Sequence, residues 1–331
     1  MSKILVTGGA GFIGSHVAEE LFNRGNDVIV LDDLSGGFTD NIASGIRFIE
    51  GSVTDVSLVN DLLDHERFDY IYHFAAYAAE GLSHFIKRFN YNNNLLGSIN
   101  LINAAVNSGV KCFVFTSSVA VYGSSPELPM REETMPHPED SYGIAKLAIE
   151  QELAICRTMF GLNYIIFRPH NVYGERQNVG DKYRNVVGIF MNQILQGKPM
   201  TVFGDGTQSR AFSYIRDISP VMADAIDTPQ AYDQIFNIGA DKPYSINELA
   251  IAVAQAMQVE PDVRHVPARN EVKHAYSSHD KVQRVFGVRK LHELDDALLA
   301  MANWVRLHGA RTSHKFEHIE VTKNFPKAWL D

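Results

Sequence analysis

Ser118, Tyr142 and Lys146 are the residues whose types and spacing suit proton transfer. Tyr142 and Lys146 are four residues apart in a stretch with helical periodicity, so their side chains lie on one face of the predicted helix. An ammonium group beside a phenol favours the phenolate and lowers its pKa, which makes the tyrosine a usable acid or base near neutral pH. A Tyr-x-x-x-Lys pair alone arises by chance. Ser118 follows a strand-like run, where a hydroxyl can meet a cofactor or substrate, and the ordered trio is more specific.

A glycine-rich turn near the N-terminus predicts a dinucleotide site. Gly8, Gly11 and Gly14 stand between a strand-like run at 3–7 and a helical pattern at 12–24. The glycines permit a tight turn, close approach of a pyrophosphate, and close packing of helix on strand. The N–H groups at the helix start, which include those of Phe12 and Ile13, would face the phosphates. An ordinary structural turn is the alternative.

The second strand-like run, at 28–31, is followed by two acids, Asp32 and Asp33. Asp32 stands 18 residues after Gly14 and would accept hydrogen bonds from the adenosine ribose hydroxyls. A carboxylate there repels a 2′-phosphate, and no Arg or Lys lies between Asp32 and Asp40 to offset the repulsion. The expected cofactor is therefore NAD, in preference to NADP.

Strand-like and helix-like stretches alternate as far as residue 168. Further strands are predicted at 46–50, 70–74, 112–116 and 163–168, with helices at 56–65, 91–108 and 142–160. Such alternation is typical of a doubly wound parallel sheet, a Rossmann-type α/β fold whose ligands bind at the carboxyl ends of the strands. The further cofactor-binding candidates are Val53, Phe74, Ala75, Ala76 and Ser117 after these strands, and Asn94 at the start of the helix over 91–108.

Two of these stretches have a second interpretation. The small residues after 74 either admit a flat ligand or pack under a helix. The asparagines at 92–94 either cap a helix or include one buried asparagine that orders the catalytic groups. Beyond 169, helices at 186–196, 246–257 and 294–307 and strands at 200–203 and 211–214 predict a smaller, mixed α/β, substrate-binding domain.

Composition narrows the class of protein. The chain has 331 residues and a net charge of −9, which does not suggest nucleic-acid binding, and no apolar run is long enough to span a membrane. Its first strand begins at once and leaves no room for a signal peptide. Cys112 and Cys156 have neither metal-ligand spacing nor a disulfide framework, so we expect a cytoplasmic protein without a metal site.

The motifs together resemble extended short-chain dehydrogenases/reductases, in particular nucleotide-sugar epimerases. The similarity covers nearly the whole chain and includes VTGGAGFIGSH, HFAAYA, YNNNLLGS, TSSVAVYG, SYGIAK, RPHNVYG, VFGDGTQSRAFSYIRDI and PARNEVKHAY. It implies that Ser118, Tyr142 and Lys146 are catalytic. It also implies that Asn171, Arg210 and Arg269 contact the diphosphate of the sugar nucleotide, with UDP the expected nucleotide. The expected domains are 1–168 for NAD and 169–331 for substrate, interleaved, with part of 209–238 returning to the first.

The chain departs from the family pattern at several positions. Family members often carry Asp after the third strand, where this chain has Gly51-Ser52-Val53, and phenylalanine where His170 stands. His170 could reach the sugar or be a satisfied histidine, and Glu80 could touch a sugar hydroxyl or cap a helix. The remaining substrate-binding candidates are Val187 and Ala275. Ala275 borders the substituent at carbon 2 of the sugar if the shortened loop at Asn270 does not shift the alignment by one residue.

The expected activity is inversion of carbon 4 of a UDP-hexose or UDP-N-acetylhexosamine through a 4-keto intermediate. A 4,6-dehydratase would carry Asp-Glu where this chain has Val119-Ala120, and a decarboxylase would also want an acid near there. A non-catalytic NAD-sensing regulator would not need the trio. The resemblance also implies a homodimer built on helices 91–108 and 142–160, whose apolar side chains either form that interface or cover the sheet: Leu95, Leu96, Ile99, Ile102, Leu147, Ile149 and Leu153.

Overall fold

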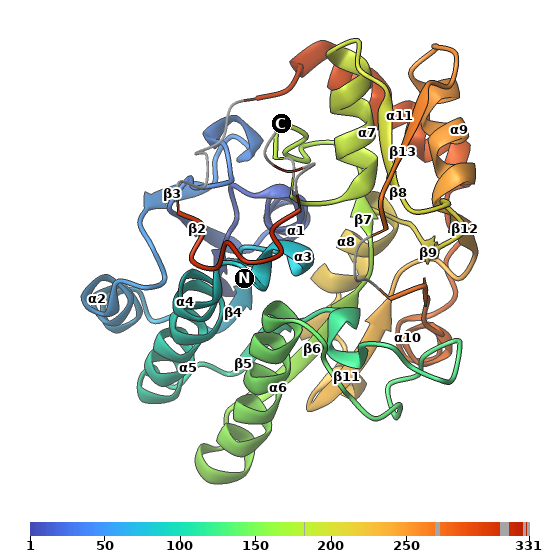
Figure 1. Ribbon diagram of the computed structural model, residues 1–331. Coiled ribbons are helices and arrows are strands. Elements are labelled where there is room, and N and C mark those ends of the chain that lie inside the picture. The colour runs from blue at the N-terminus through green and yellow to red at the C-terminus, as the bar shows by residue number, and fades with distance from the viewer. Residues whose placement is uncertain (182, 269–271, 312–317, 327–328, 330–331) are drawn as a thin grey trace.

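The structure of the chain is a computed structural model that describes residues 1–181, 183–268, 272–311, 318–326 and 329. At its centre lies a seven-stranded parallel sheet with the strand order β11-β6-β5-β4-β1-β2-β3 (Figure 1). The strands are β1 (Lys3–Thr7), β2 (Asp27–Asp32), β3 (Arg47–Glu50), β4 (Tyr70–His73), β5 (Cys112–Thr116), β6 (Asn163–Pro169) and β11 (Gln234–Ile238). The order reverses between β1 and β4, and ligands of such sheets bind beside this reversal.

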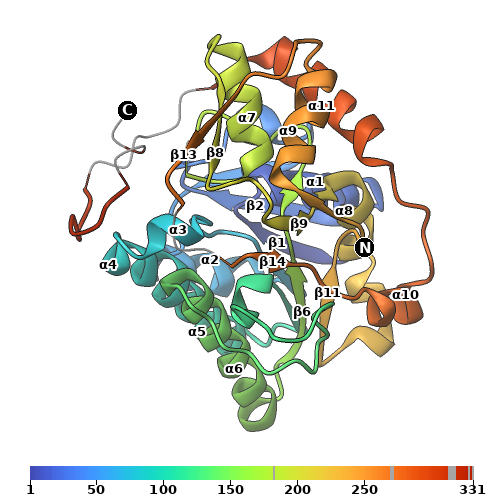
Figure 2. The same ribbon diagram turned by 45° about the vertical axis from the view of Figure 1, so that its right-hand side comes forward.

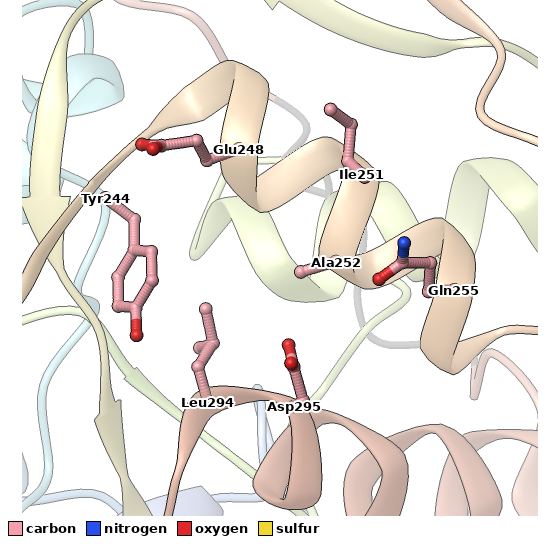
Figure 3. A pocket seen from close by; sticks show the side chains of 7 residues that line it. All are labelled: Tyr244, Glu248, Ile251, Ala252, Gln255, Leu294 and Asp295. Carbon is pink, nitrogen blue, oxygen red and sulfur yellow. The ribbon is translucent and has the colours of Figure 1, made fainter.

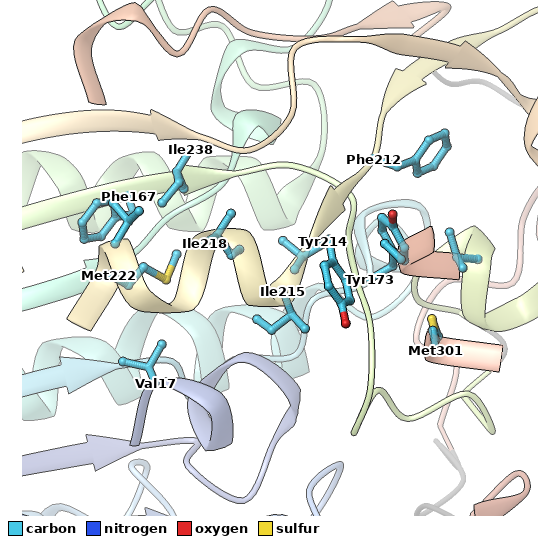
Figure 4. Packing of buried hydrophobic residues seen from close by; sticks show 14 of the residues in the cluster. Val17, Phe167, Tyr173, Phe212, Tyr214, Ile215, Ile218, Met222, Ile238 and Met301 are labelled. Atoms are coloured by element: carbon cyan, nitrogen blue, oxygen red, sulfur yellow. The ribbon is translucent and has the colours of Figure 1, made fainter. Parts of the chain in front are cut away.

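Helices cover both faces of the sheet, as a parallel sheet requires because its two faces are apolar. On one face pack α2 (Val56–Glu66), α5 (Gly97–Ser108) and α6 (Ser141–Phe160). On the other face lie α1 (Phe12–Asn23) and α8 (Ile215–Ala223), where Val17, Ile218 and Met222 join one buried cluster (Figure 4). The predicted Rossmann-type fold is confirmed.

Residues 213–238 lie against the first half of the chain. This stretch contains β10 (Ser213–Tyr214), which pairs with β7 (Val172–Tyr173), then α8, two short turns η4 (Ala225–Asp227) and η5 (Pro229–Ala231), and the edge strand β11. Most of the second half is thus separated from the sheet, while this part completes it. The division of the chain at residue 168 stays a prediction.

The rest of the second half is a small mixed α/β arrangement. β8 (Met200–Phe203) pairs with β13 (Val263–Val266), and β9 (Ser209–Ala211) lies between β12 (Pro243–Ser245) and β14 (His274–Ala275). Its helices are α7 (Val186–Leu195), α9 (Ile246–Ala256), α10 (Asp280–Phe286) and α11 (Leu294–His308). Helices α7, α9 and α11 gather at one end of the molecule in both views (Figures 1 and 2).

Short elements complete the loops around the sheet. They are η1 (Thr39–Asn41), α3 (Glu80–Ser83), α4 (Lys87–Asn90), the π-helix η2 (Tyr91–Leu96) and η3 (Val119–Tyr122). None of the helices in the described ranges is both long and apolar enough to cross a bilayer.

Two sequence-based predictions of elements were wrong in detail. The helix expected over 91–108 is a π-helix followed by α5, and the asparagines at 92–94 do not cap it, because η2 continues directly from α4. The strand expected over 211–214 is divided into β9 and β10 at Phe212. Both departures arise where side chains bind the backbone of another segment, which a local pattern does not record.

Candidate active site

The glycine turn joins β1 to α1 at the carboxyl end of the sheet. Gly8 has φ of +69°, and a Cβ there would lie 2.6 Å from the backbone nitrogen of Ala75. A Cβ on Gly14 would lie 2.2 Å from the carbonyl oxygen of Gly8, so only glycine lets helix and turn approach this closely. Gly11 is the N-cap of helix α1 and offers no side-chain cap, which leaves the first N–H groups, at Phe12 and Ile13, for an anion. This turn fits the pyrophosphate of a dinucleotide.

Asp32 ends β2 beside this turn and is 8% exposed. Its Oδ2 accepts a hydrogen bond from the N–H of Ala10 at 3.0 Å, and its Oδ1 accepts one from the N–H of Leu34 at 2.8 Å. Burial raises the pKa of the carboxyl, while these two donors lower it. Asp33 is exposed and accepts from the N–H of Ser35 at 3.0 Å. Asp32 therefore braces the turn, and its contact with an adenosine ribose stays a prediction.

A buried polar chain supports the backbone at Phe74, Ala75 and Ala76, which are themselves partly exposed. His73 lies between the hydroxyls of Thr7, 2.6 Å from its Nδ1, and Ser98, 2.8 Å from its Nε2. Burial lowers the pKa of His73 to about 3, so the ring is neutral. Sequence reasoning missed His73, because its partners come from β1 and α5.

Asn94 is the buried asparagine that the sequence offered as one of two interpretations, and it is 1% exposed. Its Oδ1 accepts from the N–H of Tyr77 at 2.8 Å, and its Nδ2 donates to the Tyr77 carbonyl at 3.0 Å. It also donates to Asn90 at 2.8 Å, and Asn90 donates to the carbonyl of Ser141 at 2.8 Å. The asparagine pair thus ties the segment after β4 to the start of α6.

Val53, the cofactor candidate after β3, is buried against Gly97, and its carbonyl accepts from Asn100 at 3.1 Å.

The three predicted catalytic residues come together at the carboxyl ends of β4 and β5. Ser118 begins η3, and its Oγ accepts from the N–H of Ala120 at 3.1 Å. Tyr142 and Lys146 stand one turn apart on α6, with Lys146 Nζ 5.6 Å from the centre of the tyrosine ring. Lys146 Nζ donates to the carbonyl oxygen of Thr116 at 2.7 Å, and the Ser118 side chain is close enough to Tyr142 to lower the pKa of its phenol.

The effect of Lys146 on Tyr142 differs from the sequence-based expectation. The pKa of Tyr142 is raised, first by burial and then by the nearby Glu80 and Asp140 carboxylates, while the hydrogen bond with Ser118 lowers it. Burial lowers the pKa of Lys146 to about 7, against a smaller opposing effect of Glu150. A lysine that is partly neutral at pH 7 favours a phenolate less than a full ammonium does, so desolvation decides both shifts.

An ion pair lies directly beneath the trio. Arg168 Nε donates to Glu150 Oε1 at 2.9 Å, Nη2 contacts Glu150 Oε2, and both side chains are almost fully buried. The hydroxyl of Ser117, a predicted cofactor contact, donates to the same Glu150 Oε1 at 2.5 Å. Arg168 Nη1 donates to the Tyr122 hydroxyl at 2.7 Å. The pKa of Arg168 is raised, because its bonds to Glu150 outweigh the lowering by burial. These contacts fix β6 against α6.

The predicted substrate residues Asn171, Arg210 and Ala275 lie on neighbouring segments. Arg210 is paired with Ala275 where β9 meets β14, and its Nη1 donates to the carbonyls of Ser209 at 2.8 Å and Lys273 at 3.0 Å. Asn171, in a left-handed conformation with φ of 40°, donates to the carbonyl of Ala211 at 3.3 Å. Ala275 packs against the cluster of Val121, Tyr122 and Met130, and the first two of these lie three and four residues after Ser118 in the chain. Arg269 lies outside the described residues.

The other substrate candidates are placed less favourably. His170 is 2% exposed, with Nδ1 2.9 Å from the Ala211 carbonyl and Nε2 3.1 Å from His279 Nε2, which fits a satisfied buried histidine. Val187 is fully buried in the core. Glu80 is exposed at the start of α3 and contributes to the raised pKa of Tyr142. All these roles stay predictions.

Arg184, which the sequence did not single out as a site residue, contacts two segments near the site. Its guanidinium lies 5.0 Å from the ring centre of Tyr77 and pairs with Asp181 at 2.9 Å. A Cβ on Gly36 would lie 2.5 Å from Arg184 Nη2, so the arginine packs on the loop that follows Asp33. This guanidinium brings a positive charge close to both Tyr142 and the phosphate-binding turn.

The described residues offer no site for a metal ion. They contain no group of three or more His, Cys, Asp or Glu residues arranged to hold a metal ion. A shallow hollow of about 230 Å³ between α9 and α11 is lined by Tyr244, Glu248, Ile251, Ala252, Gln255, Leu294 and Asp295, none of which was a site candidate (Figure 3).

Comparison with known proteins identifies relatives along most of the chain. The UDP-glucose 4-epimerase of Lactobacillus helveticus is 30% identical over 325 residues, which cover 92% of this chain and 98% of that protein. A UDP-N-acetyl-alpha-D-glucosaminuronate decarboxylase of Bacillus cytotoxicus is 31% identical over 290 residues, or 83% and 86% of the two chains.

The similar solved structures are also nucleotide-sugar epimerases. The UDP-glucose 4-epimerase of Thermotoga maritima, in complex with UDP-glucose, has a TM-score of 0.88 at 31% identity and covers 92% of this chain and 99% of its own. The UDP-glucose 4-epimerase of Thermus thermophilus, in complex with NAD, has a TM-score of 0.86 at 32% identity and covers 93% of this chain and 100% of its own. A UDP-N-acetylglucosamine 4-epimerase of Methanobrevibacter ruminantium, in complex with UDP-N-acetylmuramic acid, has a TM-score of 0.84 at 29% identity and covers 92% of this chain and 98% of its own.

A sequence model of the NAD dependent epimerase/dehydratase family matches residues 4–239. This range contains the glycine turn, Asp32 and the Ser118–Tyr142–Lys146 trio, and the turn fits a dinucleotide. The chain therefore belongs to the NAD-dependent epimerase/dehydratase family and takes NAD as its cofactor.

Proposed function

We propose that this chain is an NAD-dependent 4-epimerase that inverts carbon 4 of a UDP-hexose or UDP-N-acetylhexosamine through a 4-keto intermediate. The observation that carries the proposal is the convergence of Ser118, Tyr142 and Lys146, at the carboxyl end of the sheet, with no acid at Val119 or Ala120. The UDP-sugar epimerases among its relatives and structural neighbours support it.

In this proposal each member of the trio has one task. Tyr142, as phenolate, takes the proton of the sugar 4-hydroxyl and later returns it, and Ser118 hydrogen-bonds the same oxygen. Lys146 orients the cofactor's nicotinamide ribose. Bound NAD supplies a reversible hydride acceptor, whose cationic nicotinamide ring also favours the phenolate over the phenol.

The diphosphate is held from the second half of the chain. Arg210 and Arg269 present planar guanidinium groups, which suit paired hydrogen bonds to a diphosphate, and Asn171 adds an amide donor. Inversion requires the 4-keto sugar to turn over while it remains bound. Anchoring at the diphosphate rather than at the sugar is compatible with that movement.

One relative is a decarboxylase, so decarboxylation is a second candidate reaction. Elimination or decarboxylation would need an acid just after Ser118, yet Ala120 is nearly buried and Val119 packs beside Val121 and Tyr122. Neither side chain transfers a proton. A regulator that only senses NAD would have no need for the trio.

The test is incubation of the purified protein with NAD and a panel of nucleotide sugars, followed by NMR of the anomeric protons. Interconversion of two sugars that differ at carbon 4, with no net change of NAD, is the expected result. A 6-deoxy-4-keto or pentose product would assign the chain to the other reactions, and no turnover of any sugar would favour the regulator.

Substrate breadth is proposed to depend on Ala275. Its small side chain stands beside the segment after Ser118 and is paired through its backbone with Arg210, so it leaves room for an acetamido group at carbon 2. We expect UDP-N-acetylglucosamine to be accepted as well as, or in preference to, UDP-glucose. Ala275→Tyr should lower kcat/KM for the N-acetyl sugar relative to UDP-glucose, with Ala252→Tyr in the distant hollow as the control. An unchanged ratio would show that Ala275 is not the gate.

The protein is further proposed to act as a cytoplasmic homodimer. Cys112 and Cys156 are both buried and unpaired, which fits a reducing compartment. Exposed apolar side chains on α6 support the dimer and are considered below.

A further inference from the structure

Two histidines from distant parts of the sequence are in direct contact beside the substrate residues. The Nε2 atoms of His170 and His279 are 3.1 Å apart, the rings are stacked with centres 5.2 Å apart, and each residue is 2% exposed. On the far side, His279 Nδ1 lies 2.6 Å from the Asp241 carboxylate, whose side chain is 61% exposed. The result is a chain of polar groups that leads from the surface, through two buried imidazoles, to the carbonyl oxygen of Ala211.

The partners at the two ends decide where the protons are. The Ala211 carbonyl can only accept, so His170 Nδ1, at 2.9 Å, carries a proton. Burial holds His170 neutral, with a pKa lowered to about 3, so its Nε2 is a bare acceptor. His279 Nε2 must then donate to it, with Ser277 Oγ at 3.3 Å as a second acceptor, and His279 Nδ1 must donate to Asp241. Only a doubly protonated His279 satisfies both contacts.

This chain joins three segments that carry predicted substrate contacts. His170 precedes Asn171, and both side chains donate to the same Ala211 carbonyl, next to Arg210 on β9. His279 follows β14, four residues after Ala275. The surrounding backbone is shaped for the contact, since a Cβ on Gly239 would lie 2.8 Å from His170 Nε2.

We propose that His279, charged and held between Asp241 and His170, is a positioning residue that fixes Asn171, Arg210 and Ala275 in place for the nucleotide sugar. The proposal rests on the proposed function for the nature of the substrate. Of the trio, Ser118 caps η3 and the other two residues lie on α6, outside this chain of contacts. Loss of His279 therefore disorders the substrate contacts before binding and leaves proton transfer intact once the substrate is bound.

The first experiment compares His279→Gln with His292→Gln in the full-length protein. His292 also lies 2.6 Å from an aspartate, Asp217, but at the surface and away from the site. In His279→Gln we expect the Kd for UDP, measured by titration calorimetry, and the KM for the sugar nucleotide to rise about tenfold, as for a lost hydrogen bond to a charged group. We expect kcat to stay within about twofold of wild type, because the trio is untouched. His292→Gln should match wild type in every constant.

A second variant changes a surface residue, so its folding does not depend on whether the core accepts a substitution. In Asp241→Asn the carboxylate that favours a charged His279 is lost, and a neutral ring has a single N–H, so it can no longer donate both to His170 and to residue 241. UDP binding should weaken here too, whereas Asp40→Asn should leave it unchanged. Asp40 is a matched control, since its side chain is 63% exposed and is paired at 2.6 Å with Arg311.

Nitrogen-15 NMR of the histidine rings reads the protons directly. We expect an imidazolium signature for His279 and an Nδ1-protonated neutral ring for His170. A neutral His279 in the wild type, an unchanged UDP affinity in both variants, or a fall in kcat at unchanged KM would each overturn the proposal. UDP binding and the NMR signature require no turnover, so absence of epimerase activity would reject the proposed function without deciding this one.

Discussion

At the scale of single residues, burial acts in opposite directions on the two titratable members of the trio. It raises the pKa of Tyr142 and lowers that of Lys146, because a phenolate and an ammonium are both poorly solvated there. Without a bound ligand the pair therefore tends toward phenol and amine. Formation of the reactive phenolate is then linked to what binds beside it, which the sequence-based expectation of a simple ammonium–phenolate pair did not include.

Tyr142→Phe should reduce kcat by about 10²–10⁴-fold, the usual contribution of a positioned acid or base. The fold should be retained, since the buried ring stays and only its hydroxyl is lost. Steady-state kinetics at saturating sugar, with circular dichroism of the folded protein, measures both. Tyr164→Phe on β6 is the control and should behave as wild type. Near wild-type kcat in Tyr142→Phe would contradict the assigned role.

Lys146→Met should abolish the part of the pH dependence of stability that arises from this buried lysine. The folded-state pKa of Lys146 is about 7, while an unfolded lysine has a pKa near 10.4. Between these values the unfolded state binds the additional proton, so the wild-type free energy of unfolding rises with pH by up to about 1.4 kcal/mol per unit. Below pH 7 both states are protonated and the contribution is constant.

Urea unfolding at intervals from pH 6 to 9 checks this expectation. The stability of Lys146→Met relative to wild type should be greatest at low pH, where the wild type carries the cost of a buried charge, and should decline above pH 7. Lys290→Met, at an exposed position, should follow the wild-type slope. Parallel wild-type and Lys146→Met curves would rule out the buried titration.

At the scale of elements, the sequence predicts what is local and misses what topology brings together. The glycine turn, Asp32 and the Tyr142–Lys146 pair were predictable, because each depends on spacing within one strand, turn or helix. The His170–His279 contact joins residues 109 apart, and Arg168 meets Glu150 only because β6 lies beside α6. The π-helix likewise depends on Tyr77, whose backbone binds Asn94. Such partners are set by the sheet order, which periodicity alone does not give.

The contact between β6 and α6 is predicted to depend on the Arg168–Glu150 pair. Arg168→Met leaves the Glu150 carboxylate buried without its cation and should destabilise the fold by about 3–5 kcal/mol. The double variant Glu150→Leu/Arg168→Met removes both charges and should lose less than the sum of the two single changes. Urea unfolding of the four proteins measures the coupling. Arg157→Met, which breaks the partly exposed pair with Asp233, should cost at most about 1 kcal/mol, and a similar cost for Arg168→Met would contradict the prediction.

At the scale of the whole molecule, the surface of α5 and α6 bears on assembly. The apolar residues first named for the interface mostly cover the sheet: Ile102, Ile149 and Leu153 are buried, and Leu95, Ile99 and Leu147 pack against buried clusters. Of the two interpretations that the sequence left open, covering the sheet therefore applies to the buried residues of this set, and a contribution of the others to an interface stays a prediction. Leu96 is 54% exposed, and α6 adds an exposed stripe of Ile144, Ile155 and Met159 at 44%, 53% and 67%.

The three exposed residues on α6 are spaced 11 and 4 residues apart, which places them on one side of the helix. Helix α6 packs beside α5. A second copy related by a two-fold axis would place its own α5 and α6 against this stripe and bury both stripes, which is the self-complementary contact expected of a homodimer.

Light scattering at micromolar concentration should therefore give twice the chain mass of 37.0 kDa. Ile155→Asp should shift the protein toward the monomer, because it places a carboxylate in the middle of the interface. Ile251→Asp, at a 48% exposed site on α9, should leave the dimer intact. A monomeric wild type would refute the dimer, and dissociation by Ile251→Asp instead of Ile155→Asp would place the interface on α9.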